Sequence, residues 1–298
     1  MASTLSSESQ FVVDLLKTLR NEKFSPAAWV RFIARSWEMS RQTARDNPTL
    51  KRSWSRVSLV LGGLAFVLFS SSFVLEGPAV ALRLLPGFLF CVAWQINDLY
   101  WHLGLNRQPS TGALLSTVGI ANFCAQLRGL AASFLLGRLV GGVATPTALT
   151  LLAFLCGIIT DILDGQIARR TSTQSKLGQI TDGEADFCLY LAVTVILIQS
   201  GILPIWVGIL MLARFLMPLL AALASYFILA HPVRFGSTMW GKYAGLAQCL
   251  YFLVLLAPPQ LAGITRLVNL PLLIVTLALM IAAPAAQILA NVRQEKRS

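Results

Sequence analysis

Long apolar segments alternate with short polar ones between residues 57 and 292 of this 298-residue chain. An α-helix needs about 20 apolar residues to cross a bilayer, and eight segments come close to that length. These segments are 57–75, 79–97, 121–141, 146–168, 182–200, 203–229, 243–257 and 268–292. The pattern therefore predicts an all-α, polytopic membrane protein with about eight spans.

The same pattern divides the chain into parts. Two spans with almost no charge inside them form an accessory hairpin at 57–97, and a polar link at 98–112 joins it to a six-span core at 113–292. A basic, amphipathic preface occupies residues 1–56, and a short tail occupies residues 293–298.

The preface contains a pattern typical of an amphipathic helix. Its apolar positions are Trp29, Phe32, Ile33 and Trp37, whereas Arg31, Arg35, Arg41 and Arg45 lie elsewhere on the helix. Such a helix lies in the lipid headgroup layer or packs on the protein's own cytoplasmic face. Asn47 and Pro48 are predicted to end it.

The composition agrees with a membrane protein, because 56% of the residues are hydrophobic and only 12% are charged. Residues 1–56 carry ten Lys or Arg against five Asp or Glu, and Arg293, Lys296 and Arg297 follow the last span. Both termini are therefore expected in the cytoplasm, in a bacterial inner membrane rather than an organelle membrane. The net charge of +11 suits anionic lipid and does not indicate a nucleic-acid partner.

Four carboxylates stand at the facing ends of two apolar segments, where charge is costly. Asp161 and Asp164 are i,i+3 neighbours, and Asp182 and Asp186 are i,i+4 neighbours. Each pair therefore shares one helix face, and the short polar link folds the pairs toward each other. Such a cluster needs a cation, and Mg²⁺ or Mn²⁺ is predicted because both prefer hard oxygen ligands. Glu184 points off this face and is not an expected ligand.

The spacing resembles the signature of the CDP-alcohol phosphatidyltransferase family, D-x2-D-G-x2-A-R-x8-G-x3-D-x3-D. The matching positions are Asp161, Asp164, Gly165, Ala168, Arg169, Gly178, Asp182 and Asp186. The resemblance implies a Mg²⁺-dependent transferase of phospholipid biosynthesis with a six-helix core. It would move a phosphatidyl or other substituted phosphate group from a CDP-alcohol, with CDP-diacylglycerol as the expected donor, to an alcohol and release CMP.

The resemblance also implies roles for the motif residues. The first three aspartates would hold metal, and Asp186, beside the same metal, would be the general base. Gly165, Ala168 and Gly178 would leave room for the CDP moiety, with Arg169 near the diphosphate or paired with an aspartate. Small residues in this pattern also suit close helix packing, so that alternative stays open.

A second, partial resemblance lies at the start of the core. The segment A-N-F-C-A-Q-L-R is similar to the family's P-N-x-L-T-x-x-R, with Ala121 and Ala125 in place of Pro and Thr. Asn122 and Arg128 are accordingly expected near the nucleotide.

Three later cations are candidates for the acceptor site. Arg214 stands inside an apolar span, and Arg234 and Lys242 flank a segment that resembles the family's G-K segment. A guanidinium fork suits phosphate oxygens, which favours a phosphorylated acceptor. Alternatively, Arg214 pairs with the aspartates and the other two anchor a loop. Phe187 stands where glycerol phosphate enzymes often carry Lys and inositol-type enzymes Arg, so other alcohols remain open.

Two other classes use acidic residues in membranes. An intramembrane prenyltransferase would need two separated Asp-rich motifs, and the core shows one paired cluster. A cation transporter would favour broken helices at mid-membrane with internal repeats. The transferase is therefore the preferred interpretation, and the resemblance implies a homodimer.

Overall fold

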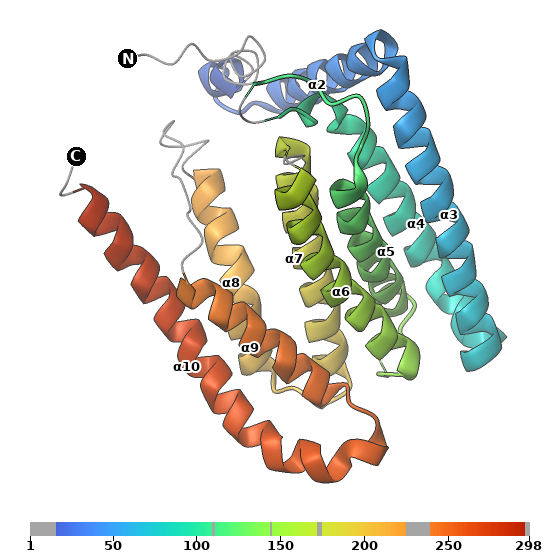
Figure 1. The fold of residues 1–298 in the computed structure, drawn as a ribbon, viewed down its shortest axis with the longest axis vertical. Coiled ribbons are helices and arrows are strands. Elements are labelled where there is room, and N and C mark those ends of the chain that lie inside the picture. The colour runs from blue at the N-terminus through green and yellow to red at the C-terminus, as the bar shows by residue number, and fades with distance from the viewer. Residues whose placement is uncertain (1–15, 109–110, 144, 172–174, 225–238, 296–298) are drawn as a thin grey trace. The chain divides into compact units, whose positions relative to one another are not determined.

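The computed structural model describes residues 16–108, 111–143, 145–171, 175–224 and 239–295, with the backbone alone at 168–171, 218–219, 221–224 and 284–295. The long regular elements in these residues are α-helices, which Figure 1 labels. They are α2 (Pro26–Asp46), α3 (Pro48–Glu76), α4 (Pro78–Trp101), α5 (Ile120–Val140), α6 (Ala148–Thr171), α7 (Lys176–Gln199), α8 (Ile205–Ala224), α9 (Met239–Leu255) and α10 (Ala262–Glu295). Short 3₁₀ helices η1 (Leu103–Leu105) and η3 (Pro259–Leu261) precede α5 and α10.

Five helical segments of the described residues are long and apolar enough to cross a membrane. They are Pro48–Glu76, Pro78–Trp101, Ile120–Val140, Ala148–Ile167 and Pro259–Ala283. The predicted all-α, polytopic membrane protein is thus confirmed. The other predicted spans fall on α7, α8 and α9, and the total of eight spans stays a prediction because α7 carries three carboxylates and the apolar segment of α8, Ile205–Met217, is short.

Local sequence explains where several helices begin. The Ser25 hydroxyl accepts a hydrogen bond from the Ala28 amide at 3.2 Å and Pro26 follows it, so α2 has both a side-chain cap and a proline in its first turn. Asn47 separates α2 from Pro48, the first residue of α3, as predicted. Glycines with positive φ, Gly77 before α4 and Gly201 before α8, allow the tight reversals between neighbouring helices.

The chain forms two compact units. The first comprises the described parts of Met1–Ser71, Leu89–Leu130 and Ile159–Asp186, and the second comprises those of Ser72–Phe88, Ala131–Ile158 and Phe187–Ser298. The first unit has a buried apolar cluster that joins α2, α3, α4, the α4–α5 link and α7. Its buried members are Ala44, Leu50, Leu99, Leu103, Val118 and Leu177.

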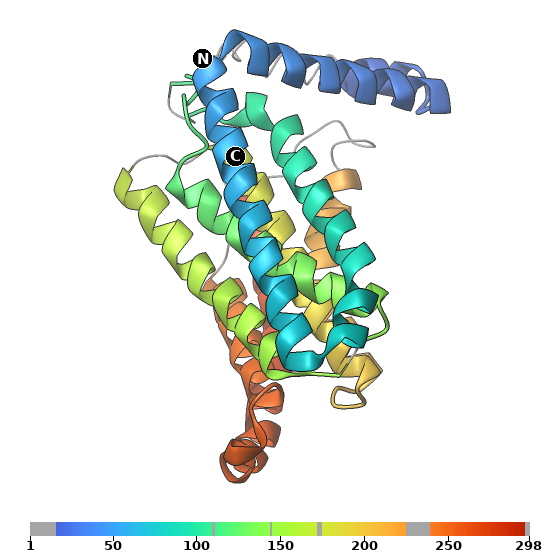
Figure 2. The same ribbon diagram turned by 90° about the vertical axis from the view of Figure 1, so that its right-hand side faces the viewer.

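Helix α2 runs at a wide angle to α3 (Figure 2), and its two halves differ. In the second half, the Ser40 hydroxyl donates to the Trp101 carbonyl, and the ring of Trp37 packs on those of Tyr100 and Trp101. In the first half, Trp29 and Ile33 are 37% and 47% exposed. The second half of α2 therefore packs on the protein, whereas the first half exposes apolar side chains, as expected of a helix that lies in a lipid headgroup layer.

Aromatic rings form much of the interior of the second unit. Phe154 of α6 packs on Tyr190 of α7 and Phe252 of α9, and Tyr190 also packs on Phe215 of α8, with ring centroids 5.2 to 5.9 Å apart. Helix α10 packs along α9, as Figure 1 also shows.

Glycines let α4 and α5 approach closely within this unit. A Cβ at Gly137 would lie 2.8 Å from the backbone of Phe88, and one at Gly141 would lie 2.5 Å from the carbonyl oxygen of Arg83. Small residues four positions apart are typical of closely packed membrane helices.

A buried ion pair links α3 to α5 in the second unit. The guanidinium of Arg138, fully buried, donates to both carboxylate oxygens of Glu76 at 2.6 and 2.7 Å and to the Thr145 carbonyl at 3.1 Å. Ser72 donates to the same carboxylate at 2.7 Å. The sequence analysis did not single out either charge.

We expect Glu76→Ala to destabilise the protein by about 3–5 kcal/mol, because it leaves the Arg138 guanidinium buried without its carboxylate. Thermal unfolding in detergent measures the effect, with Ala at the exposed Arg83 as control. The double variant Glu76→Leu, Arg138→Met should recover much of the loss. If Glu76→Ala unfolds at the wild-type temperature, the pair contributes little.

Candidate metal and nucleotide site

The four predicted aspartates lie in the first compact unit, on α6 and α7. Asp161 and Asp164 stand on the second half of α6, and Asp182 and Asp186 stand on the first half of α7. Carboxylate oxygens of Asp161, Asp182 and Asp186 all lie within 4.8 Å of one another. The two pairs therefore face each other, as their spacing in the sequence predicts.

One guanidinium, that of Arg128 on α5, contacts all four carboxylates. Its Nη1 donates to Asp182 at 2.6 Å and to Asp186 at 2.5 Å. Its Nη2 pairs with Asp164 and lies 3.2 Å from Asp161. Asp164, outside the group of three, thus joins the cluster through the arginine.

Burial increases toward the arginine. The side chain of Arg128 is 0% exposed and that of Asp164 is 12% exposed, whereas Asp182 and Asp161 are 45% and 53% exposed. Nε of Arg128 is buried with no hydrogen-bond partner among the described residues. Among the described residues, one guanidinium faces four carboxylates here, so the site retains capacity for further cations on its exposed side.

The residues fit a hard divalent cation. Three converging carboxylates, partly open to solvent, supply the oxygen ligands that Mg²⁺ and Mn²⁺ prefer. Asp161, Asp182 and Asp186 would hold the ion directly, with Asp164 beside them.

Asn122 lies at the start of α5 and is almost fully buried. Its Nδ2 donates to the Val118 carbonyl at 2.7 Å and lies 3.3 Å from Oδ1 of Asn106 and 3.5 Å from Oγ of Ser175. Ser175 in turn caps α7, accepting from the Gly178 amide at 3.0 Å. A Cβ at Gly178 would lie 2.5 Å from Oδ1 of Asn122, so this glycine lets the asparagine approach α7.

The other predicted nucleotide residues are described less fully. Gly165 is half-buried on α6. The side chains of Ala168 and Arg169 lie outside the described residues, so their predicted roles stay predictions.

The three acceptor candidates also differ. Arg214 of α8 donates to Oε1 of Gln248 at 3.2 Å and lies over the ring of Phe215. Lys242 is exposed near the start of α9. Arg234 lies outside the described residues.

Some residues of the site were not found from the sequence. Asn106 and Ser175 join the Asn122 network, and each stands in a polar link with no motif of its own. Gln248, next to Arg214, carries a buried amide nitrogen that has no hydrogen-bond partner in the part of the chain that the structure describes. A lone Gln within an apolar span was the available signal for it.

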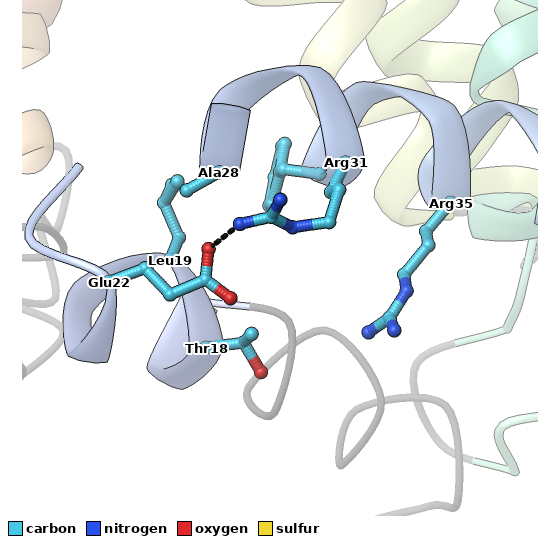
Figure 3. Close-up of a pocket in the computed structure, with 7 residues that line it drawn as sticks. Thr18, Leu19, Glu22, Ala28, Arg31 and Arg35 are labelled. Carbon is cyan, nitrogen blue, oxygen red and sulfur yellow. Dashed lines mark hydrogen bonds and ion pairs between the residues drawn. The ribbon is translucent and has the colours of Figure 1, made fainter. Parts of the chain in front are cut away.

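A pocket on the first unit contains none of these residues. It lies between the helical residues 16–21 and the start of α2, where Arg31 pairs with Glu22 and Arg35 stands at the rim (Figure 3).

Residues 118–284 match the family model for CDP-alcohol phosphatidyltransferase, which covers more than half of the chain. The chain therefore belongs to this family of transferases, and the resemblance drawn from the motif is confirmed. Neither a curated protein nor a solved structure matches it. The family assignment favours phospho-alcohol transfer from a CDP-alcohol over prenyl transfer and cation transport, and members of this family are typically metal-dependent.

We expect Arg128→Gln to lower the thermal midpoint without divalent ions and to enlarge the increase that Mg²⁺ produces. The substitution takes the Arg128 guanidinium away from the buried Asp164 and from the other three carboxylates, so an ion that binds the folded state stabilises the variant more. Arg138→Gln is the matched control, an equally buried arginine on the same helix that pairs with Glu76. Equal Mg²⁺ shifts in both variants would contradict this prediction.

Proposed function

We propose that this protein transfers the phosphatidyl group of CDP-diacylglycerol to the hydroxyl of a small alcohol or phospho-alcohol and releases CMP. The convergence of the four motif aspartates around Arg128 supports this proposal most directly. It places carboxylates of two helices where a metal and a diphosphate would both be recognised.

Asp186 acts as the general base in this proposal. It takes the proton from the acceptor hydroxyl, whose oxygen attacks the β-phosphorus while the bond from that phosphorus to the bridging oxygen breaks. CMP departs with the bridging oxygen. Asp161, Asp182 and Asp186, with Asp164 beside them, would hold Mg²⁺ or Mn²⁺, which would neutralise charge on the diphosphate. The 31% exposure of the Asp186 side chain supports its role, because a base must be reached by the acceptor.

The nucleotide would bind beside α5 and the facing ends of α6 and α7. Asn122 and Arg128 would contact it, and Gly165, Ala168 and Gly178 would leave room for it, with Arg169 near the diphosphate. Arg128 already provides guanidinium N–H groups at the aspartates, where a diphosphate bound to the same metal would arrive.

Arg214, Arg234 and Lys242 would hold the acceptor. The contact of Arg214 with Gln248 supports this part, because Gln248 offers a buried amide N–H that has no partner within the described residues. A guanidinium and an amide donor side by side suit an anionic or hydroxylated group.

The orientation and assembly are part of the proposal. The excess of Lys and Arg in residues 1–56 supports cytoplasmic termini in a bacterial inner membrane. Homodimerisation follows from the family resemblance alone.

The reaction is tested with purified protein, labelled CDP-diacylglycerol, Mg²⁺ and a panel of alcohols, with CMP and the lipid product identified by mass. We expect CMP release that depends on both Mg²⁺ and one acceptor. Asp186→Asn should lower turnover by about 10² to 10⁴, because it removes the general base.

Binding measurements distinguish the loss of a general base from the loss of CDP or metal binding. Asp186→Asn should keep most of its affinity for CDP, whereas Asp161→Asn and Asp164→Asn should weaken metal dependence and CDP binding together. Near-normal turnover in Asp186→Asn would disprove its role as base.

We expect Arg214→Gln and Gln248→Leu to raise the acceptor KM with little change in donor affinity, as when an interaction holds one substrate alone. Steady-state kinetics with each substrate varied in turn provides the measurement. Gln199→Leu, at the exposed end of α7, is the control. If both variants lose donor binding equally, the acceptor assignment is wrong.

A further inference from the structure

The family match begins at residue 118, so α2, α3 and α4 precede it. The first compact unit nevertheless contains Met1–Ser71 and Leu89–Leu130 together with all four aspartates. Helix α2, most of α3 and the second half of α4 are thus in the same packed unit as the four aspartates, which raises the question of what this half of α4 does there.

Three polar residues of α4 and its end lie on one helix face. Gln95, Asp98 and His102 are spaced at i, i+3 and i+7. This spacing brings side chains two turns apart to the same side, and each of the three contacts a partner on that side.

Gln95 fixes α5 at the turn that carries Arg128. Its Nε2 donates to the backbone carbonyl of Gln126 at 2.6 Å and to the Gln126 side-chain oxygen at 2.9 Å. A Cβ at Gly129 would lie 2.7 Å from the same nitrogen. The glycine that follows Arg128 therefore provides the space that the Gln95 amide occupies.

Asp98 and His102 reach α7 between two of the aspartates. Nδ1 of His102 lies 3.1 Å from a carboxylate oxygen of Asp98, and the carboxyl group of Glu184 lies within hydrogen-bonding reach of Asp98. Burial alone would lower the pKa of His102, but the hydrogen bond and charge of Asp98 and the charge of Glu184 raise it above its usual value. The Asp98 carboxyl group thus joins the imidazole of His102, at the end of α4, to Glu184 of α7.

Helix α4 is itself held firmly at this level. Nε1 of Trp54 on α3 donates to the carbonyl of Ile96 at 3.1 Å, and Leu99 is fully buried in the same apolar cluster as Leu177 of α7. A polar face on an element fixed in this way can set the positions of its neighbours.

We propose that Gln95, Asp98 and His102 are positioning residues that hold the Arg128 turn of α5 and the Asp182–Asp186 turn of α7 in register for metal binding. The C-terminal end of α4 with His102, outside the family match, is then a working part of the catalytic unit. This inference rests on the proposed metal site.

The experiment measures Mn²⁺ binding to the full-length protein by electron paramagnetic resonance, beside thermal unfolding. Gln95→Leu removes the amide at nearly constant volume, and Asn97→Leu makes the same change at an exposed position of the same helix. We expect roughly 10-fold weaker Mn²⁺ binding for Gln95→Leu, the range typical for residues that orient metal ligands. Asn97→Leu should bind as the wild type does.

A second pair of variants tests the α7 contact. His102→Leu should weaken Mn²⁺ binding, and His102→Gln, which keeps a donor for Asp98, should restore part of it. Variants that lose thermal stability yet bind Mn²⁺ normally would show a purely structural role and overturn the inference. If the wild type binds no Mn²⁺, the metal site itself fails and takes this inference with it, a result distinct from the first.

Discussion

The contact of the Arg128 guanidinium with four carboxylates is the interaction on which the rest of the site depends. Four acidic groups from two helices cannot converge in an apolar environment unless a cation lies among them. Arg128 is fully buried and reaches both carboxylates of α6 and both of α7. The position of α5 therefore determines how the aspartates face one another, and whatever fixes α5 also shapes the site.

Helix α5 carries a second buried arginine, and both arginines are paired with carboxylates of other helices. Arg138 is also fully buried, and the Glu76 carboxylate holds it at the end of α3. An unpaired guanidinium costs several kcal/mol in such surroundings, so each arginine commits α5 to a specific partner. Arg128 pairs with carboxylates of α6 and α7, and Arg138 pairs with Glu76 at the end of α3.

The sequence predicted the elements well and their pairings poorly. Apolar segment length gave the helices, and the Asp motif gave the facing carboxylates, because both depend on positions close together in the chain. Helix α3 begins at Pro48, earlier than the predicted span at residue 57, since the polar residues between them contain no helix breaker. The pairing of Glu76 with Arg138 was not predicted, because the two residues are far apart in the chain and a local sequence pattern does not show which distant side chain a buried charge will contact.

Two glycines of α5, and Gly141 just after it, make room for α4, although α4 precedes the residues that match the family model. Gly129 provides room for the Gln95 amide, and Gly137 and Gly141 allow the backbone of α4 to approach α5 elsewhere along its length. Gly in the middle of a helix costs about 1 kcal/mol relative to Ala, and the two such positions in α5, Gly129 and Gly137, are accounted for by a single neighbour, as is Gly141 just after the helix. All three stand inside the matched region, whereas that neighbour, α4, stands outside it. The core helix is therefore shaped for the accessory helix, which argues that the two belong to one working structure.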